Sequence, residues 1–380
     1  MTELGDYIYV GTARNMFSTT AISFGFSDSN NTISLPPSLV SGNDNCAEIW
    51  RYKKDNSGPW QRVLKTKPYE KIYGFRAMIT HVSNKPAIYA ASSGENINLY
   101  KSTDGVNWLK NQWTLVGNKG FGDKLNFSTL STGVFNGHLY AAFTKKLPLA
   151  LFMPLGFDLI RIDENDNWDL VVGGKLIVPS SPSTGKRCDK SLSGYDSGFN
   201  NLFNVYGWQI QEYKNNLIIT TYDGSTNIKA ILQAYLYDKE NYIKQIGCKN
   251  YYTLIECYKK ILNLICKYNY PEGFDIYVSK DGCKFKPVIL NGLYNPNNYG
   301  GRTLYKTCDN KLYLGTANPF DGLEVWEVLS RQYSTHSNTC FSSKEIKSYL
   351  CNLKALNNAI LELYPSILKI LYNSLDSASL

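Results

Sequence analysis

The chain has 380 residues, of which 43% are hydrophobic and 14% aromatic, and its formal net charge is +8. This apolar content is enough for a sizeable core in one large or two ordinary domains. Lysine outnumbers arginine four to one and no block of basic residues stands out, which favours an evenly solvated surface over a nucleic-acid partner. Charge or proline interrupts the most apolar windows, 254–266 and 353–372, so we expect no membrane span.

Cysteine and histidine give no sign of a metal site. The nine cysteines lack Cys-x-x-Cys spacing, and the three histidines lie far apart in the sequence. We therefore expect no metal and no cofactor. The first residues show neither the basic nor the apolar region of a secretory signal. Together with the odd number of cysteines, this predicts a cytoplasmic location and leaves secretion open.

A short strand pattern containing tyrosine or β-branched residues recurs five times along the chain. The five copies are 6–15, 86–94, 137–145, 215–224 and 310–319. Another strand-like run precedes four of these copies, at 74–82, 127–135, 207–214 and 300–307. A third run follows each copy, at 47–53, 97–102, 157–162, 274–279 and 323–328. A turn, an aromatic residue and a fourth strand then complete the pattern.

The repeating unit is therefore four short antiparallel strands, with the first copy lacking its first strand and the last copy lacking its fourth. Such a unit cannot bury both faces alone, so the units must stack, and radial stacking protects their edges. The sequence predicts an all-β fold, a five-bladed β-propeller over residues 1–330. A sixth blade remains open if 16–45 or 174–204 hides a degenerate copy.

Two turns between third and fourth strands share the pattern Ser-x-Asp-Gly-x-x-aromatic. A Ser or Asp side chain can hydrogen-bond the backbone of its own turn, and Gly accepts a positive φ there. The aromatic residue is expected to pack under the hairpin. The residues are Ser102, Asp104, Gly105 and Trp108 in the first turn, and Ser279, Asp281, Gly282 and Phe285 in the second.

These turns resemble the Asp-box, or BNR repeat, of sialidase-like propellers, whose fuller pattern is Ser-x-Asp-x-Gly-x-Thr-Trp. Here the Gly directly follows the Asp and the Thr is missing. The resemblance covers roughly residues 6–328. It implies a propeller in which the box is a structural turn on the rim, away from the ligand.

Two segments break the strand pattern with helical spacing. The first is an insertion at about 248–270, ended near Pro271. The second is a C-terminal segment, 341–380, in which Ser342 and Glu345 fit a capping box and Pro365 separates two helices. Its apolar stripe comprises Ile346, Leu350, Leu353, Leu356, Ile360 and Leu363. The segment either docks on the propeller or serves oligomerisation or a partner through residues 342–380.

In a propeller the first strands line the central channel, so their side chains are ligand-binding candidates. Arg76 and Arg302 occupy equivalent places, with Gln209 as their counterpart in the fourth unit. Two guanidinium groups near one axis could clamp a carboxylate. The resemblance to sialidases, which bind a substrate carboxylate with an arginine cluster, implies the same. Their tyrosine nucleophile, its glutamate partner and their aspartic acid match no motif here, and each arginine could instead tie neighbouring blades together.

Loops after second strands supply further candidates. Asp223 and Asp321 fall at similar offsets and are weak catalytic candidates, because paired carboxylates suit glycoside hydrolysis. Each precedes a Gly, however, which is also a turn signature. Asn318 lies in one of these loops as a ligand-binding candidate. The possible sugar-stacking aromatics, which could equally belong to the core, are Tyr206, Trp208, Tyr299 and Phe320.

The sequence favours non-catalytic binding of a glycan or a protein partner at the mouth of the ring. One alternative is a sialidase-like glycoside hydrolase that uses Asp223 or Asp321. The other is a scaffold acting through its C-terminal helices. No nucleotide loop, zinc signature or hydrolase elbow is present, which leans against an enzyme; if the chain is one, we expect a glycoside hydrolase.

Overall fold

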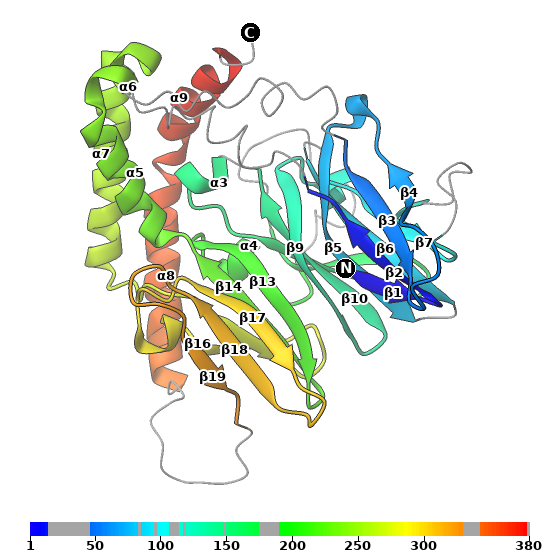
Figure 1. The fold of residues 1–380 in the computed structure, drawn as a ribbon. Helices are drawn as coiled ribbons and strands as arrows, with labels where there is room; N and C mark the ends of the chain where they lie inside the picture. The colour runs from blue at the N-terminus through cyan, green and yellow to red at the C-terminus, as the bar shows by residue number, and fades with distance from the viewer. Residues whose placement is uncertain are drawn as a thin grey trace. The chain divides into compact units, whose positions relative to one another are not determined.

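The computed structural model describes residues 1–13, 46–82, 85–94, 97–105, 114–116, 119–146, 149–174, 190–329 and 343–377. The chain forms two compact units. Unit 1 comprises Met1–Leu147 and Asp158–Gly194, and unit 2 comprises Pro148–Phe157 and Tyr195–Leu380. Both consist largely of antiparallel strands, and the long helices belong to unit 2 (Figure 1).

Unit 1 contains three consecutive groups of four antiparallel strands. The first group is β1 (Thr2–Leu4), β2 (Tyr7–Gly11), β3 (Glu48–Lys53) and β4 (Gln61–Lys65). The second is β5 (Ile72–Val82), β6 (Pro86–Gly94), β7 (Leu99–Ser102) and β8 (Thr114–Val116). The third is β9 (Asn126–Phe135), β10 (His138–Lys145), β11 (Asp158–Ile162) and β12 (Trp168–Val172).

The prediction that the first group lacks its first strand is wrong. β1 pairs with β2 in antiparallel register, with Thr2 opposite Tyr9 and Leu4 opposite Tyr7. Gly5 closes the hairpin with a φ of +55°, which glycine adopts without steric cost. Three residues are too few to show an alternating pattern in the sequence, so this strand is recognisable only from its pairing.

Unit 2 contains one group of four strands and one of three. The first is β13 (Asn204–Tyr213), β14 (Asn216–Asp223), β15 (Ile276–Ser279) and β16 (Phe285–Ile289). The second is β17 (Gly300–Lys306), β18 (Leu312–Ala317) and β19 (Val325–Glu327). Residues 330–342, where a fourth strand of the last group would follow β19, lie outside the described ranges, so the absence of that strand stays a prediction.

The predicted fold class is confirmed: the chain is mostly β and consists of repeated antiparallel strand groups of the propeller-blade type. Within unit 1 the first strands β1, β5 and β9 pack successively, and within unit 2 β13 packs against β17. Closure into one ring and the number of blades stay predictions. Residues 16–45 lie outside the described ranges, and residues 190–203 form turns and the short helix α4 (Ser197–Asn200).

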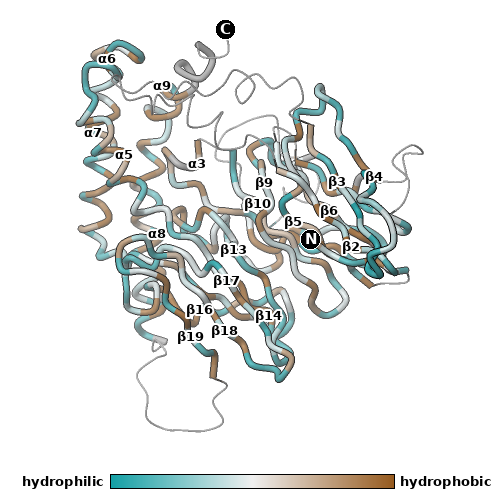
Figure 2. The backbone as a smooth tube through the Cα atoms, viewed as in Figure 1, coloured by the Kyte–Doolittle hydropathy of each residue, from teal (hydrophilic) through white to brown (hydrophobic). Residues whose placement is uncertain are grey.

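Apolar side chains from alternate strand positions form the core of each unit. In unit 1 one buried cluster centres on Tyr9, Ile49 and Phe75, and another on Leu139, Phe143 and Ile160. In unit 2 Phe274, Leu312 and Leu314 lie at the centre of a third cluster. Hydrophobic and hydrophilic residues accordingly alternate along the strands (Figure 2).

The two Ser-x-Asp-Gly turns have the predicted hydrogen bonds. The Ser102 hydroxyl accepts from the Gly105 amide at 2.8 Å, and the Ser279 hydroxyl accepts from the Gly282 amide at 2.8 Å. Both glycines have positive φ, +63° and +75°. Phe285 is buried beside Phe199, with ring centroids 5.2 Å apart, whereas Trp108 lies outside the described residues.

We predict that Ser279→Ala lowers the free energy of unfolding by about 1 to 2 kcal/mol, because it leaves the buried Gly282 amide without its acceptor. Urea unfolding followed by tryptophan fluorescence measures this change. Lys280→Ala, which alters the exposed neighbour, should stay within about 0.5 kcal/mol of the parent chain. Equal effects of the two substitutions would contradict a structural role for the serine.

Helices cluster in unit 2. They include α3 (Leu149–Phe152), α5 (Ser225–Tyr237), α6 (Lys239–Ile246), α7 (Cys248–Lys267), α8 (Ser343–Leu361) and α9 (Tyr364–Ser377). The predicted insertion at 248–270 corresponds to α7, but the insertion begins earlier, at α5. As predicted, Pro365 lies where one C-terminal helix gives way to the next. No helix in the described ranges is both long and apolar enough to span a membrane.

The C-terminal helices pack within unit 2. Leu353, Leu356 and Ile360 are buried, and α8 and α9 both contact α7. The Asn357 side chain donates to the backbone oxygen of Asn200 at 2.6 Å. The apolar stripe is thus used inside the unit. Ser342 of the predicted capping box lies outside the described residues, and oligomerisation through 342–380 stays a prediction.

Candidate binding site

Four half-buried aromatic side chains form a cluster on β13, β14 and the start of β17 in unit 2. The ring of Tyr222 is 4.9 Å from Tyr206, 5.4 Å from Trp208 and 5.2 Å from Tyr299. Trp208 and Tyr299 lie nearly parallel, with centroids 6.3 Å apart. We call these four residues the aromatic cluster. Three of them were predicted from the sequence as stacking aromatics, and Tyr222 joins them through the pairing of β13 with β14.

A glycine allows Trp208 to lie against the neighbouring strand. A Cβ atom at Gly300 would collide with the indole ring, and one at Gly301 would meet the side chains of Thr220 and Phe274. The Thr220 hydroxyl in turn donates to the Gly301 backbone oxygen at 2.5 Å. The Gly-Gly pair at the start of β17 therefore sets how closely the tryptophan approaches the backbone.

Arg302 extends the aromatic cluster with a positive charge. Its guanidinium carbon lies 5.2 Å from the Trp208 ring centre, within cation–π range. The Gln209 side-chain amide donates to the Arg302 backbone oxygen at 2.8 Å, which ties β13 to β17. Arg302 is exposed and forms no ion pair with a carboxylate in the described part of the chain. Its charge is therefore oriented by the tryptophan but not neutralised.

Asp321 lies in an asparagine network beyond the end of β18. One carboxylate oxygen accepts from Asn295 at 3.2 Å, Asn297 at 2.9 Å and Asn318 at 3.2 Å. These hydrogen bonds hold the pKa of the Asp321 carboxyl below its usual range. The group stays ionised at neutral pH and is no proton donor there. Phe320, beside it, is 71% exposed.

Asp223 is fully buried, and its side chain accepts hydrogen bonds mainly from backbone amides. Its carboxylate accepts from the amide and hydroxyl of Ser225, at 2.8 and 2.9 Å, and from the Gly273 amide at 2.6 Å. Burial raises its pKa to about 7. These contacts account for the residue at the junction of β14 with α5, and burial keeps its carboxylate out of reach of a ligand on the protein surface.

Arg76 is an exposed residue of β5 in unit 1, whereas Arg302 belongs to unit 2. The two units are described separately, so the predicted clamp of both arginines stays a prediction. Gln209, Trp208 and Arg302 are brought together, and Asn318 and Phe320 lie in the neighbouring Asp321 network.

A repeated loop motif went unnoticed in the sequence. Residues 120–126, 198–204 and 292–298 each begin with Gly and end with Asn, and we call them the asparagine loops. In each loop the last asparagine donates to the backbone oxygen of the first glycine, at 3.0, 3.0 and 2.9 Å. It also donates to an acid before or at a third strand: Asp158 at 3.3 Å, Asp275 at 2.8 Å and Glu324 at 3.0 Å.

The first asparagine loop carries a buried ion-pair cluster in unit 1. The Lys145 ammonium lies 2.7 Å from Asp123, 2.6 Å from Asp158 and 3.0 Å from the Asn126 side-chain oxygen. All four residues are at most 4% exposed. The ammonium is shared between the two carboxylates, and because all of these groups are buried we interpret the cluster as structural.

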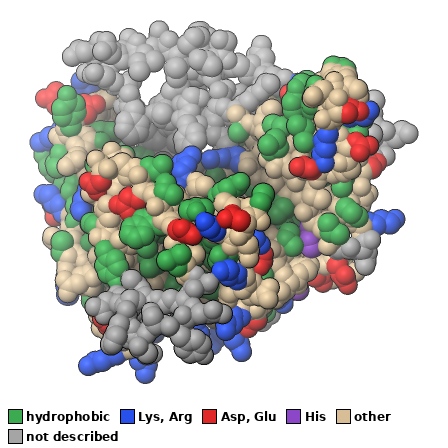
Figure 3. Space-filling model, turned by 60° about the horizontal axis from the view of Figure 1, so that its bottom comes forward, with side chains coloured by type: hydrophobic (Ala, Val, Ile, Leu, Met, Phe, Trp, Pro, Cys, Tyr) green, Lys and Arg blue, Asp and Glu red, His purple; other side chains and the backbone are tan. Residues whose placement is uncertain are grey.

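Acidic and basic side chains occur side by side on the face shown in Figure 3, without a basic stripe. In the described part of the chain, no group of three or more His, Cys, Asp or Glu side chains is arranged to hold a metal ion. The cysteines that the structure describes are free thiols.

No family model and no curated protein matches the sequence. Similar solved structures include an endo-arabinase from Bacteroides thetaiotaomicron, with a TM-score of 0.34 and 11% identity over 77% of this chain and 88% of that chain. They also include an exo-β-1,3-galactanase from Phanerochaete chrysosporium, with a TM-score of 0.27 and 12% identity over 47% of this chain and 35% of that chain. A Trypanosoma rangeli sialidase in complex with sialic acid has a TM-score of 0.25 and 12% identity over 53% of this chain and 30% of that chain.

Proposed function

We propose that the chain binds an acidic carbohydrate without cleaving it, through the aromatic cluster and Arg302. The observation that carries this proposal is the exposed Arg302 guanidinium, which lies 5.2 Å from the Trp208 ring centre and forms no ion pair with any described residue. A planar guanidinium recognises a carboxylate with two parallel hydrogen bonds, and half-buried aromatic rings offer apolar faces and edges to sugar rings.

The neighbouring carboxylates support binding rather than hydrolysis. Glycoside hydrolysis requires one carboxylic acid that is protonated near neutral pH and within reach of the substrate. Hydrogen bonds from asparagines keep the pKa of Asp321 low, and the pKa of Glu324 is also lowered despite partial burial, through Asn295, Asn298 and Trp326. Asp223, whose pKa is raised, is fully buried.

Binding of sialyllactose and of an oligogalacturonate, with lactose as the neutral comparison, tests the proposal by titration calorimetry. We predict that Trp208→Ala weakens binding of the acidic ligand by about tenfold or more. Arg302→Ala should remove the preference for acidic over neutral sugar. Trp60→Ala, which alters a 46%-exposed tryptophan of unit 1, is the matched control and should leave the affinity unchanged.

Four results would contradict the proposal. One is the absence of binding to either acidic ligand, and another is binding that both substitutions leave unchanged. The third is turnover of a chromogenic glycoside by the parent chain, which would favour the hydrolase alternative. Capture of a protein partner in place of a glycan would likewise reassign the surface.

A further inference from the structure

The second asparagine loop lacks the counter-charge that the first one has. In unit 1 Lys145 lies directly opposite Asn126 in the pairing of β10 with β9. In unit 2 the same position, opposite Asn204 in the pairing of β14 with β13, is occupied by Asp223. A buried lysine is thus replaced by a buried aspartate, while the acid before the third strand, Asp275, is retained.

In the third asparagine loop, too, the residue equivalent to Lys145 donates a hydrogen bond to the side-chain oxygen of the loop's last asparagine. There Asn318 donates to the Asn298 side-chain oxygen at 3.0 Å, just as Lys145 donates to the Asn126 oxygen at 3.0 Å. Asp223 cannot replace this donor while ionised. The Asn204 side-chain oxygen accordingly has no hydrogen-bond partner among the described residues, although the residue is completely buried.

Two more oxygens of the same neighbourhood are buried without a partner in the described part of the chain: one carboxylate oxygen of Asp275 and the Tyr349 hydroxyl. The other Asp275 oxygen accepts from Asn204 at 2.8 Å, Asn201 at 3.3 Å and Tyr277 at 3.2 Å. The charge of Asp275 raises the cost of ionising Asp223, and both carboxylates act on Tyr349. No lysine, arginine or histidine in the described ranges forms an ion pair with either carboxylate.

From these contacts we propose that Asp275, Asn204, Tyr349 and Asp223 of unit 2 form a site for a hard metal cation, which takes the electrostatic place of the Lys145 ammonium. Two carboxylates, an amide oxygen and a phenol oxygen are ligands that suit Ca²⁺ or an alkali ion. Two negative charges favour Ca²⁺. The proposed site contains only two acidic side chains. It is therefore consistent with the finding that no three His, Cys, Asp or Glu side chains in the described part of the chain are grouped to hold a metal ion.

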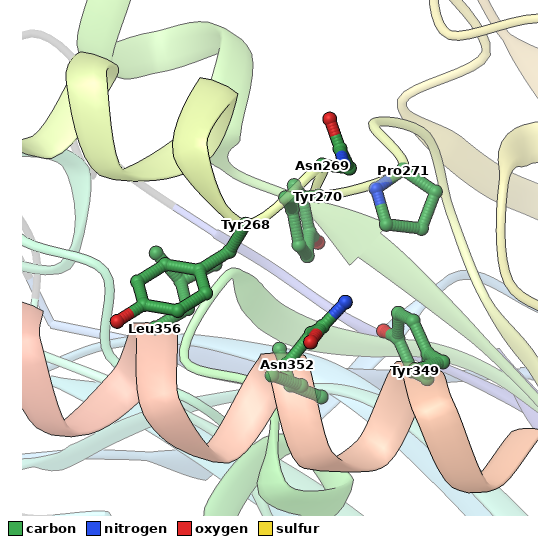
Figure 4. Close-up of a pocket in the computed structure, with 8 residues that line it drawn as sticks. Tyr268, Asn269, Tyr270, Pro271, Tyr349, Asn352 and Leu356 are labelled. Atoms are coloured by element: carbon green, nitrogen blue, oxygen red, sulfur yellow. The ribbon is translucent and has the colours of Figure 1, made fainter.

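A pocket lies beside this site. It has a volume of about 120 Å³ and lies between α8 and the segment that follows α7. Tyr270 extends into it from that segment, and Tyr349 and Asn352 face it from α8 (Figure 4). The Tyr270 hydroxyl accepts from Asn201 at 3.0 Å, so the pocket wall is connected directly to the carboxylate cluster.

Thermal unfolding of the full chain tests the site after treatment with chelator. Ca²⁺, Mg²⁺, K⁺ and Na⁺ are added separately at fixed ionic strength, with tetramethylammonium chloride as the reference salt. We expect saturable stabilisation, largest for Ca²⁺, with a rise in midpoint of about 5 °C at hundredfold excess over Kd. Metal analysis of the dialysed protein should give one bound ion per chain.

Two variants make the test specific. Asp275→Asn should abolish the saturable rise, and Tyr349→Phe, which removes only the hydroxyl, should weaken the apparent affinity at least threefold. Asp321→Asn, an exposed carboxylate of the same unit, should leave the response intact. Midpoints that do not depend on the cation, or a cation response that Asp275→Asn retains, would overturn the proposal in favour of a water molecule or a proton.

Discussion

Replacing Lys145 with methionine should lower the free energy of unfolding of unit 1 by about 3 to 5 kcal/mol. The ammonium lies 2.7 Å from Asp123 and 2.6 Å from Asp158, and all three residues are nearly inaccessible to solvent. Methionine retains much of the volume but leaves two buried carboxylates without a counter-charge. Such a loss costs far more than an exposed ion pair, because water cannot replace the missing cation.

Urea unfolding, combined with hydrogen exchange of the β9 and β10 amides, measures this effect and assigns it to unit 1. Lys311→Met is the control, since Lys311 is exposed and pairs with exposed Asp309 at 3.6 Å; it should leave the stability essentially unchanged. Adding Asp158→Asn to Lys145→Met should recover part of the loss, because one uncompensated charge is removed. A double variant less stable than Lys145→Met would refute the electrostatic explanation.

Much of the strand arrangement was predictable because each strand is half-buried and alternates in polarity. Repetition of tyrosine-containing strands revealed the groups, and Ser279 and Gly282 revealed the turn between the third and fourth strands. β1 was missed because three residues are too few to show the alternation of apolar and polar residues that marks a strand. Helices α5 and α6 were missed because Asp238 and Lys239 interrupt the apolar spacing between them, so tertiary packing decides the local structure there.

The site was predictable only where it follows from strand register. Trp208 and Arg302 lie on first strands, and adjacent first strands bring their side chains together. The state of Asp223 could not be predicted, because an Asp-Gly pair is equally typical of an exposed turn. The asparagine loops had a visible signal, glycine and asparagine six residues apart, but their acid partners lie 26 to 71 residues further along the chain.

The buried acids of unit 2 predict an unusual pH dependence for the chelated protein. Burial raises the pKa of Asp223 to about 7 and that of Asp275 to about 6, whereas an unfolded aspartate has a pKa of about 4. Between these values the folded chain binds more protons than the unfolded chain, so the free energy of unfolding falls as pH rises. These groups should make unit 2 more stable at pH 5 than at pH 8 by about 2 to 4 kcal/mol.

The neighbouring Tyr270, Tyr277 and Tyr349 stay neutral over this range, because burial raises the pKa of each hydroxyl well above its usual value. Asp275→Asn should therefore reduce the pH dependence and leave the protein at least as stable as the parent chain at pH 8. The amide oxygen still accepts from Asn204, while the buried charge is gone. Asp321→Asn, with a lowered pKa in the parent chain, should not flatten the curve.

Denaturant unfolding at pH 5, 6, 7 and 8 in chelator measures the dependence, and a stability that rises with pH in unit 2 would contradict the raised pKa values. Repeating the series with saturating Ca²⁺ separates this prediction from the cation site. A bound cation keeps both carboxylates ionised, so the stabilisation it provides should grow with pH and offset the loss seen in chelator. The same two aspartates would thus be stabilised by protons in acid and by a metal ion at neutral pH, whereas in unit 1 the Lys145 ammonium pairs with Asp123 and Asp158.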